Sequence, residues 1–349
     1  MRYTLQKLTT MLITLVTISF LVFLSFHLIA GDPATKMLGT EATPERLAAL
    51  RTEMGLDAPF LVRYVRWFTA FITGDFGSSY SYNMPVSAMI GDKVPITLTL
   101  TFMAFLLIIL LSIPLGVYTA KKANRLIDRI IMVVNQIIMA VPPFFAGIIL
   151  TLVFGLILRL FTPGGYVSYK TDSLKFITYL FFPALALALP KAAMAIKLLR
   201  SSVLAEARLD YVRTAYSKGN STNQVLYRHV LKNAMIPFIT FLGMTLAEMI
   251  AGSIIIEQVF GIPGLGRILL TSIANRDYPV VMAIIILIAF MVLVVNIVVD
   301  IIYGLIDPRI KQRDFLSLRS LERKQRKSKA SFGKNVEKMP FFRTVKRLR

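Results

Sequence analysis

Six long apolar runs constrain this chain more than any other feature of its sequence. A helix needs about 20 consecutive apolar residues to cross the hydrocarbon core of a bilayer, and each run is long enough to do so. The sequence is 56% hydrophobic and only 17% charged, which is outside the range of ordinary soluble domains. The runs predict an all-α polytopic membrane protein with six transmembrane helices, at about residues 10–30, 96–120, 130–160, 176–199, 236–256 and 280–302.

The distribution of charge between the runs predicts the orientation of the chain. Lys and Arg exceed Asp and Glu by 2 before the first run, 3 in residues 121–129, 6 in 191–232 and 11 from residue 304 on. The alternate segments carry −1 in residues 31–95, +2 in 159–175 and 0 in 257–279. By the positive-inside rule, both termini are cytoplasmic and the segment 31–95 is outside. The net charge of +21 is therefore a topology signal, and nucleic acid is not expected as a partner.

Residues 200–235 form a polar, basic segment between the fourth and fifth runs. Residues 204–218 are rich in helix formers, and Gly219 is suited to end a helix in a left-handed turn. Ser221, with a Gln three residues later, has the pattern of a capping box and predicts a second short helix over residues 223–233. The segment is predicted to form a docking surface on the cytoplasmic side; the alternative is a basic loop that is simply solvated.

Two stretches of this segment, RTAYSKG and RHVLKNAMIP, resemble the cytoplasmic coupling loop, called the EAA loop, of ABC importer membrane subunits. Arg213 and Thr214 stand where Glu and Ala give the loop its name, and the gap from Gly219 to Pro237 is longer than usual. Both departures resemble the peptide and nickel branch of the family. Other stretches with counterparts in the B-type peptide permease are GDP, GLDAPF, GDFGSSY, EQVFGIPGLGR, NRDYPVV and YGLIDPRI, so the resemblance extends to about residue 310.

The resemblance implies a type I ABC importer permease fold in the cell membrane. It also implies the partners: a second homologous permease, two ATP-binding subunits and an extracytoplasmic binding protein. The expected substrate is a peptide, and dipeptide, oligopeptide, glutathione, nickel and metallophore all remain open. In the family, the coupling loop docks into a groove of the ATP-binding subunit. On this chain the resemblance places that contact at Tyr211, Arg213, Thr214, Ala215 and Gly219, and it leaves His229 and Asn233 to hold the second helix at the membrane.

The sequence contains little that would support catalysis or a cofactor. It has no GxxxxGK[ST] motif, so ATP is not expected to bind to this chain through a P-loop. Its two histidines, His27 and His229, are too few for a histidine metal site, and it has no cysteine. We therefore expect no enzyme activity, no cofactor and no metal, with ATP hydrolysis on separate partner subunits.

Three polar residues inside the apolar runs are candidates for the translocation path. A carboxylate such as Glu248 near the middle of a span costs about 2.5 kcal/mol or more, so it should face water or a cation, or be protonated. It either lines the path or forms a packing pair against the second permease. Asn135 and Gln136 precede Pro142 and Pro143, which should kink the third span. These amides either make interhelical hydrogen bonds or contact substrate.

A different class of protein would use the same carboxylate differently. A stand-alone secondary transporter or channel could carry protons or select ions through Glu248. Such folds often contain an internal repeat, and none is evident in the sequence. Beyond the permease domain, residues 1–310, a basic tail at 311–349 is expected to be disordered or to lie on anionic lipid.

Proline and glycine positions predict short helices and turns in the segments on the outer side. Thr43 before a proline and Gly55 mark the ends of one helix, and Pro59 and Gly74 mark the ends of another. The second has aromatic and aliphatic residues at helical spacing and should lie in the membrane interface. The glycines of EQVFGIPGLGR predict tight turns between the fifth and sixth spans.

Overall fold

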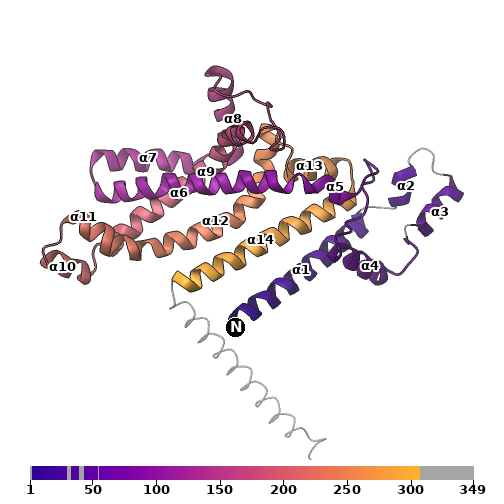
Figure 1. The fold of residues 1–349 in the computed structure, drawn as a ribbon, viewed down its shortest axis with the longest axis horizontal. Coiled ribbons are helices and arrows are strands. Elements are labelled where there is room, and N and C mark those ends of the chain that lie inside the picture. Colours follow the sequence, from indigo (N-terminus) through magenta and orange to yellow (C-terminus); the bar gives the residue numbers. More distant parts are fainter. Residues whose placement is uncertain (1, 30–32, 39–42, 54, 307–349) are drawn as a thin grey trace, which may run out of the picture. The chain divides into compact units, whose positions relative to one another are not determined.

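The computed structural model describes residues 2–29, 33–38, 43–53 and 55–306 (Figure 1). These residues form helices and one isolated antiparallel bridge, between Ser78 and Pro85. Five helices are long and apolar enough to cross a membrane, and one bent pair of helices brings the count to six. The predicted all-α class is confirmed, and the six-span count is consistent with it. The predicted tail at 311–349 lies outside the described residues.

The chain divides into two compact units, Met1–Ile297 and Val298–Arg349, and the fold below is that of the first. Its first half contains α1 (Arg2–Ile29), α2 (Pro33–Leu38), α3 (Pro44–Glu53), α4 (Phe60–Ile72), α5 (Val86–Gly91), α6 (Val94–Lys121), α7 (Leu126–Ala140) and α8 (Pro143–Leu150). The second half contains the π-helical turns η2 (Thr151–Ile157) and η3 (Val225–Val230), with α9 (Ser173–Glu206), α10 (Asp210–Ser217), α11 (Thr222–Gln224), α12 (Leu231–Phe260) and α13 (Leu265–Ala274). The last helix, α14 (Tyr278–Ile306), continues into the second unit.

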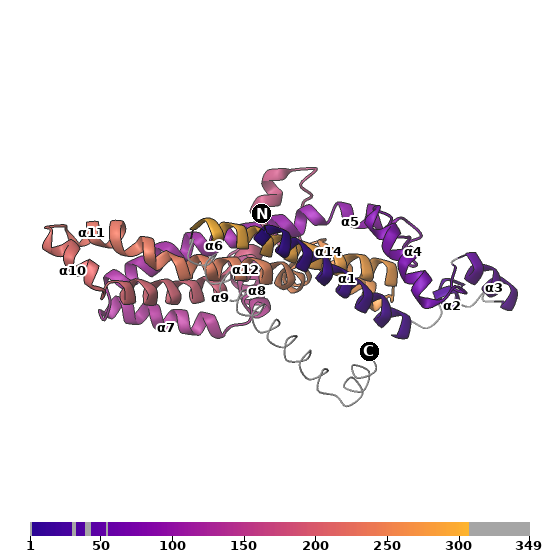
Figure 2. The ribbon, with the colours of Figure 1, turned by 90° about the horizontal axis from the view of Figure 1, so that it is seen from below.

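Helix α9 is the centre of the packing. It contacts α6, α7, α8 and α12, and Figures 1 and 2 show these helices grouped along it. Asp172 caps its N-terminus, because its carboxylate accepts hydrogen bonds from the backbone N–H groups of Leu174 and Lys175 at 3.1 and 3.0 Å. Small residues permit close approach in a membrane, where there is little hydrophobic drive between helices. The buried face of α9 is accordingly rich in alanine: Ala184, Ala186, Ala188, Ala192, Ala193 and Ala195.

The third span is bent more sharply than a proline kink. The direction of the helix axis changes by 105° from α7 to α8, and Val141 and Pro142 between them are in extended conformation. A residue that precedes proline avoids the α region, and here Pro142 and Pro143 place this restriction on two successive residues. The helix therefore stops and restarts, and the predicted single span at 130–160 is a broken pair, α7 followed by α8 and η2.

A second packed region joins the short helices α5 and α13 to the start of α14. Its buried side chains include Val86 and Ile90 from α5, Leu265 from α13 and Ile284 from α14. Helix α13 is apolar but has only 10 residues, which is too short to span a bilayer. The chain therefore folds back between the fifth and sixth spans, as the glycine-rich stretch predicts.

A buried carboxylate holds this fold-back in place. Glu257, in the last turn of α12, is fully buried and accepts hydrogen bonds from the Thr97 hydroxyl at 2.5 Å and the Gly266 N–H at 2.7 Å. The Arg267 N–H also points to it at 3.3 Å, and the Thr97 hydroxyl oxygen accepts from the Leu265 N–H at 3.0 Å. The unpaired N–H groups at the start of α13 are thereby satisfied. Glu257 lies just outside the predicted span at 236–256, and no pattern in the sequence marks it as a buried hydrogen-bond acceptor.

The glycines of this stretch are required by close contacts. A Cβ at Gly264 would lie 2.4 Å from the Glu257 carboxylate, and one at Gly266 would lie 2.3 Å from the Ile254 Cα. Gly261 ends α12 in the left-handed conformation, with φ 67°. The residues of the motif EQVFGIPGLGR therefore pack as one steric unit. It consists of the Glu257 carboxylate, the turn around this carboxylate and the start of α13, which the carboxylate caps.

A second buried carboxylate, Asp277, joins α13 and α14 to the loop after α4. It accepts hydrogen bonds from the Ser79 hydroxyl and from the backbone N–H groups of Tyr80 and Ser81, the latter two at 3.1 and 3.3 Å. Burial, together with the negative charge of Asp277, raises the pKa of Tyr80 to about 12, so this phenol is neutral at physiological pH. Two sequence motifs that lie far apart in the chain, GDFGSSY and NRDYPVV, are thus parts of one contact.

The predicted helices of the outer segment are confirmed in their bounds. Helix α3 begins at Pro44, α4 begins after Pro59, and Gly55 and Gly74 adopt left-handed conformations with φ 63° and 89°. Helix α4 packs its aromatic face on α1. The Phe23 ring centroid lies 5.2 Å from that of Trp67. The placement of α4 in a membrane interface stays a prediction.

Replacement of Gly266 tests the steric unit. We expect Gly266→Ala to lower the stability of the protein by about 1–3 kcal/mol, because the new methyl group would overlap the backbone of α12. The measurement is thermal unfolding of the purified protein in detergent. Gly91→Ala is the matched control, since no atom lies within 4 Å of its added Cβ. Equal unfolding temperatures for the two variants would contradict this account.

Candidate functional site

The segment predicted as the coupling loop folds as a compact hairpin, which we define as residues 207–230. Helix α9 ends at Glu206, the extended residue Leu209 interrupts the chain, and α10 then runs over Asp210–Ser217. The predicted continuous helix over 204–218 is therefore wrong. Neither proline nor glycine lies at this break; the turn allows Val212 and Ala215 to pack against η3.

The second half of the hairpin follows the predicted start but not the predicted end. Gly219 has φ 79°, and Ser221 and Gln224 form both hydrogen bonds of the capping box, as predicted. The helix does not stop at residue 233, because η3 leads directly into α12 and Pro237 lies inside that helix. Proline is tolerated within transmembrane helices when its neighbours satisfy the freed backbone groups.

Helix α10 has one buried and one exposed face. Val212 and Ala215 are buried, at 2% and 6% exposure, in the cluster that also contains Val225, Leu226 and Val230. The Ala215 side chain therefore packs inside the hairpin. The exposed face carries two other predicted docking residues, Arg213 and Thr214, together with Tyr216, Ser217 and Lys218, and Gly219 follows it.

Tyr211 connects the hairpin to both flanking membrane helices. Its hydroxyl donates to the Glu206 carboxylate at 2.7 Å, and the Asn233 amide donates to the same carboxylate at 3.0 Å and to the Tyr211 oxygen at 3.2 Å. Partial burial and the bond to Glu206 raise the pKa of the Tyr211 phenol, which keeps it protonated as a donor. Asn233 thus joins the start of α12 to Glu206 and Tyr211, and its expected role in holding the second helix at the membrane stays a prediction. His229 takes part only through its backbone carbonyl, 3.4 Å from the Tyr211 hydroxyl.

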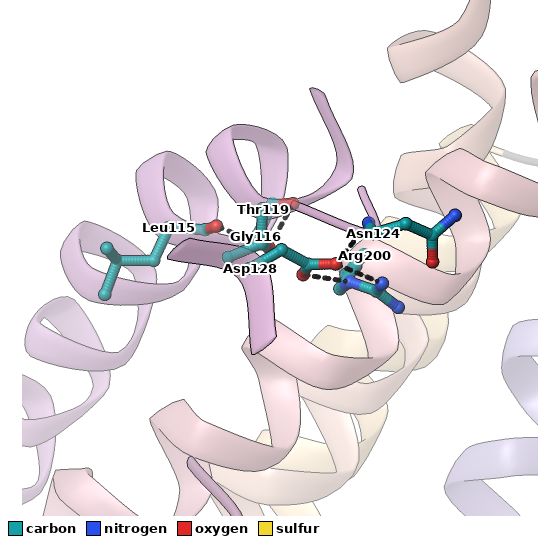
Figure 3. A network of polar contacts seen from close by, with 6 residues as sticks. All are labelled: Leu115, Gly116, Thr119, Asn124, Asp128 and Arg200. Carbon is teal, nitrogen blue, oxygen red and sulfur yellow. Dashed lines mark hydrogen bonds and ion pairs between the residues drawn. The ribbon is translucent and has the colours of Figure 1, made fainter. Parts of the chain in front are cut away.

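A bidentate ion pair lies at the base of the hairpin (Figure 3). The Arg200 guanidinium donates to the two oxygens of Asp128, and each N to O distance is 2.7 Å. Asp128 is almost fully buried, and it also accepts from the backbone N–H of Asn124 at 2.9 Å. The pair fixes the start of α7 to α9 six residues before α9 ends. Sequence reasoning counted both residues only as charges, because residues 72 positions apart give no local signal of pairing.

Two of the three candidate path residues, Glu248 and Gln136, contact lysines of α9. Glu248, on α12, forms an ion pair with Lys191. Gln136, on α7, accepts from the Lys197 ammonium at 3.4 Å. Asn135 is buried at 5% exposure, and its amide nitrogen has no hydrogen-bond partner among the described residues. Both lysines lie within the long span α9 and within its predicted range 176–199, although their charges were counted with those of the loop that follows.

A small recess lies beside the bend of the third span. Its volume is about 150 Å³, and its lining is apolar: Ile138, Val141, Ala146, Ile149, Leu150, Leu189 and Pro190. Such a lining offers no partner to a polar substrate. Within the part of the chain that the structure describes, no cluster of three or more His, Asp or Glu side chains could hold a metal ion.

Comparison with known proteins decides what class of protein this arrangement belongs to. The family described as "Binding-protein-dependent transport system inner membrane component" matches residues 112–312, and the corresponding N-terminal family matches residues 1–101. The chain belongs to this family.

Relatives match over most of the chain. A probable peptide ABC transporter permease of Sinorhizobium fredii is 33% identical over 309 residues, which are 88% of this chain and 99% of the relative. An oligopeptide transport system permease of Bacillus subtilis is 37% identical over 85% of this chain and 95% of its own length. A glutathione transport system permease of Salmonella paratyphi A is 35% identical over 90% of this chain and 100% of its own length.

Family membership confirms several predictions at once. This member of the binding-protein-dependent transport family is a multi-pass inner membrane protein and the permease component of an ABC importer. It is not an enzyme, and the ATPase resides on separate subunits. The alternative of a stand-alone secondary transporter or channel is thereby set aside.

The ion pair at the base of the hairpin can be tested by a conservative exchange. We expect Arg200→Lys to destabilise the protein by about 1.5–3 kcal/mol, because lysine cannot reproduce the two parallel hydrogen bonds to a buried carboxylate. Thermal unfolding of the purified protein is the measurement. Arg213→Lys is the matched control, since the Arg213 side chain is 81% exposed and lies 3.7 Å from Asp210. A loss of stability that is no larger for Arg200→Lys than for Arg213→Lys would refute the structural role of the pair.

Proposed function

We propose that this permease imports peptides, together with a second homologous permease that completes the translocation path. Two ATP-binding subunits would drive it, and an extracytoplasmic binding protein would deliver the substrate. The relatives support the peptide class, since they are named for peptide, oligopeptide and glutathione transport and match nearly the whole of their own lengths.

The hairpin at residues 207–230 is the element that we assign to contact with the ATP-binding subunits. The observation that supports this most directly is the division of α10 into a buried apolar face and an exposed polar face. Arg213, Thr214 and Gly219 are available on the exposed side. Ala215 and Tyr211 contribute from within: Ala215 packs the hairpin together, and Tyr211 ties it to Glu206 at the end of α9 and Asn233 in α12. A force on α10 would therefore reach two membrane spans directly.

The path itself is assigned to the polar residues of the spans, Glu248, Gln136 and Asn135. Because a bilayer offers no partners to polar groups, Glu248 must face water or protein in the assembly. Alternating access would then follow when the ATP-binding subunits close and shift the hairpin, because this moves α12, which carries Glu248, and α9, which carries the lysines that contact Glu248 and Gln136.

The orientation of the chain follows from the charge distribution. Both termini and the hairpin are assigned to the cytoplasm, and the segment 31–95 is assigned to the outside. The loop between η2 and α9, which contains Thr171, then also lies outside.

Single cysteines test this orientation directly, because the chain has no cysteine of its own. Thr214→Cys should react with a membrane-impermeant thiol reagent only from the cytoplasmic side, and Thr171→Cys only from the outside. Both positions are exposed, so reactivity reports sidedness and not burial. The opposite pattern in intact cells would overturn the assignment of the hairpin to the cytoplasm.

Docking is tested by a bulky substitution on the exposed face of α10. We expect Thr214→Trp to reduce co-purification of the ATP-binding subunits by at least about tenfold, because a large side chain would hold the helix away from a close-fitting surface. Thr171→Trp, at an exposed threonine outside the hairpin, is the matched control. Retention of the ATP-binding subunits by both variants would exclude α10 as the docking helix.

A further inference from the structure

Two lysines and a glutamate lie on faces of α9 and α12 that the chain itself leaves partly uncovered. On α12 the exposed positions Met244, Glu248 and Ile255 recur at helical spacing, and on α9 the partly exposed or exposed positions include Lys191, Met194 and Lys197. The side chain of Glu248 is 61% exposed even though it pairs with Lys191, whose side chain is 27% exposed. These charges are therefore neither sealed in the packing of the chain nor free on a soluble loop.

Such a face cannot lie against lipid. Charged side chains in a span are costly against hydrocarbon, and they are found where they meet water, a cavity or an opposite charge. The other sides of α9 are already covered by α6, α7, α8 and α12. The uncovered strip that carries Lys191, Lys197 and Glu248 is thus the side of α9 and α12 that meets water or another molecule.

The three charges do not balance. Two ammonium groups and one carboxylate leave an excess of one positive charge. Lys191 is paired with Glu248, whereas the Lys197 ammonium reaches the neutral amide oxygen of Gln136 at 3.4 Å. A neutral amide is a weaker acceptor for an ammonium group than a carboxylate is. The strip is therefore suited to receive one additional carboxylate.

We propose that Lys191, Lys197 and Glu248 form a binding site for the charged termini of a peptide in transit. Lys197 accepts the peptide carboxylate first. Lys191 then exchanges its ion pair with Glu248 for the same carboxylate, and Glu248 is released to pair with the peptide ammonium group. Each broken ion pair is replaced by another, so the substrate can enter the site and leave it without a deep energy minimum, as passage requires. This inference rests on the proposed peptide transport and specifies its recognition chemistry.

The two ends of the substrate should respond to different substitutions. Loss of the ammonium at position 197 should abolish the preference for a free carboxyl end. Loss of the carboxylate at position 248 should abolish the preference for a free amino end. A structural ion pair that only holds α9 to α12 would lower transport of all substrates alike.

The experiment uses the complete transporter, with its partner subunits and binding protein, in proteoliposomes. The probes are trialanine, N-acetyl-trialanine and trialanine amide, each with its affinity for the isolated binding protein measured separately. After correction for that affinity, we expect the wild-type protein to transport trialanine about tenfold faster than either blocked peptide. Lys197→Met should lose the discrimination against the amide only, and Glu248→Gln should lose the discrimination against the acetylated peptide only.

The outcomes are distinguishable. If the wild-type complex transports none of the three peptides, the proposed peptide transport fails, and this inference fails with it. If it transports them and both variants keep the wild-type ratios, peptide transport stands and the binding site is refuted.

Cysteine labelling supplies a second measurement that does not depend on transport. In the assembled complex, Glu248→Cys should react with a water-soluble thiol reagent, and trialanine should slow that reaction. Ile13→Cys is the control; it lies on α1, is 62% exposed and belongs to a span with almost no buried residues, so it should face lipid and stay unreactive. No reaction at position 248, with crosslinking to the second permease instead, would show that the face is a subunit contact and would overturn the inference.

Discussion

The bilayer offers no hydrogen-bond partners, and this constraint explains where the polar groups of this protein lie. Glu257 is fully buried, yet it is bound by Thr97 and by the first N–H groups of α13. Asp128 is nearly as buried, and its two carboxylate oxygens accept hydrogen bonds from two nitrogens of the Arg200 guanidinium. Each carboxylate joins segments that are distant in sequence. The hydrogen bonds that stabilise the buried carboxylate therefore also hold these segments together. Gly264 follows from it, because a Cβ there would lie 2.4 Å from the carboxylate.

Helix α9 connects the two regions to which we assign function. Its last turns carry Arg200 and Glu206, which fix α7 and the hairpin, and its middle carries Lys191 and Lys197, which meet α12 and α7. In the proposed mechanism, a displacement of the hairpin would therefore reach the charged strip along one continuous helix. The alanine-rich buried face of α9 lets its neighbours approach closely. Helix α9 thus contacts most of the other spans and also bears the lysines of the charged strip.

Local signals in the sequence predicted local structure well. The proline and glycine positions gave the bounds of α3 and α4, and the Ser221 and Gln224 pattern gave the start of the second helix of the hairpin. The same signals gave wrong helix bounds where tertiary packing determines them. Pro237 lies inside α12, and α9 stops before α10 without any breaker residue, because burial of Val212 and Ala215 against η3 outweighs helix propensity. The resemblance placed Ala215 in the docking contact, whereas the fold buries its side chain inside the hairpin.

The sequence by itself determined the class of the protein and the family to which it belongs, because apolar run length and short motifs are properties of contiguous residues. Only the tertiary structure decided which charges meet. Glu257 and Thr97 are separated by 160 residues and Asp277 and Ser79 by 198, and no local pattern marks them as partners. Likewise, the predicted span at 176–199 already contained Lys191 and Lys197, but it did not show that they contact Glu248 and Gln136. Pairing across a membrane fold depends on which helix faces meet, and that is fixed by packing of the whole chain.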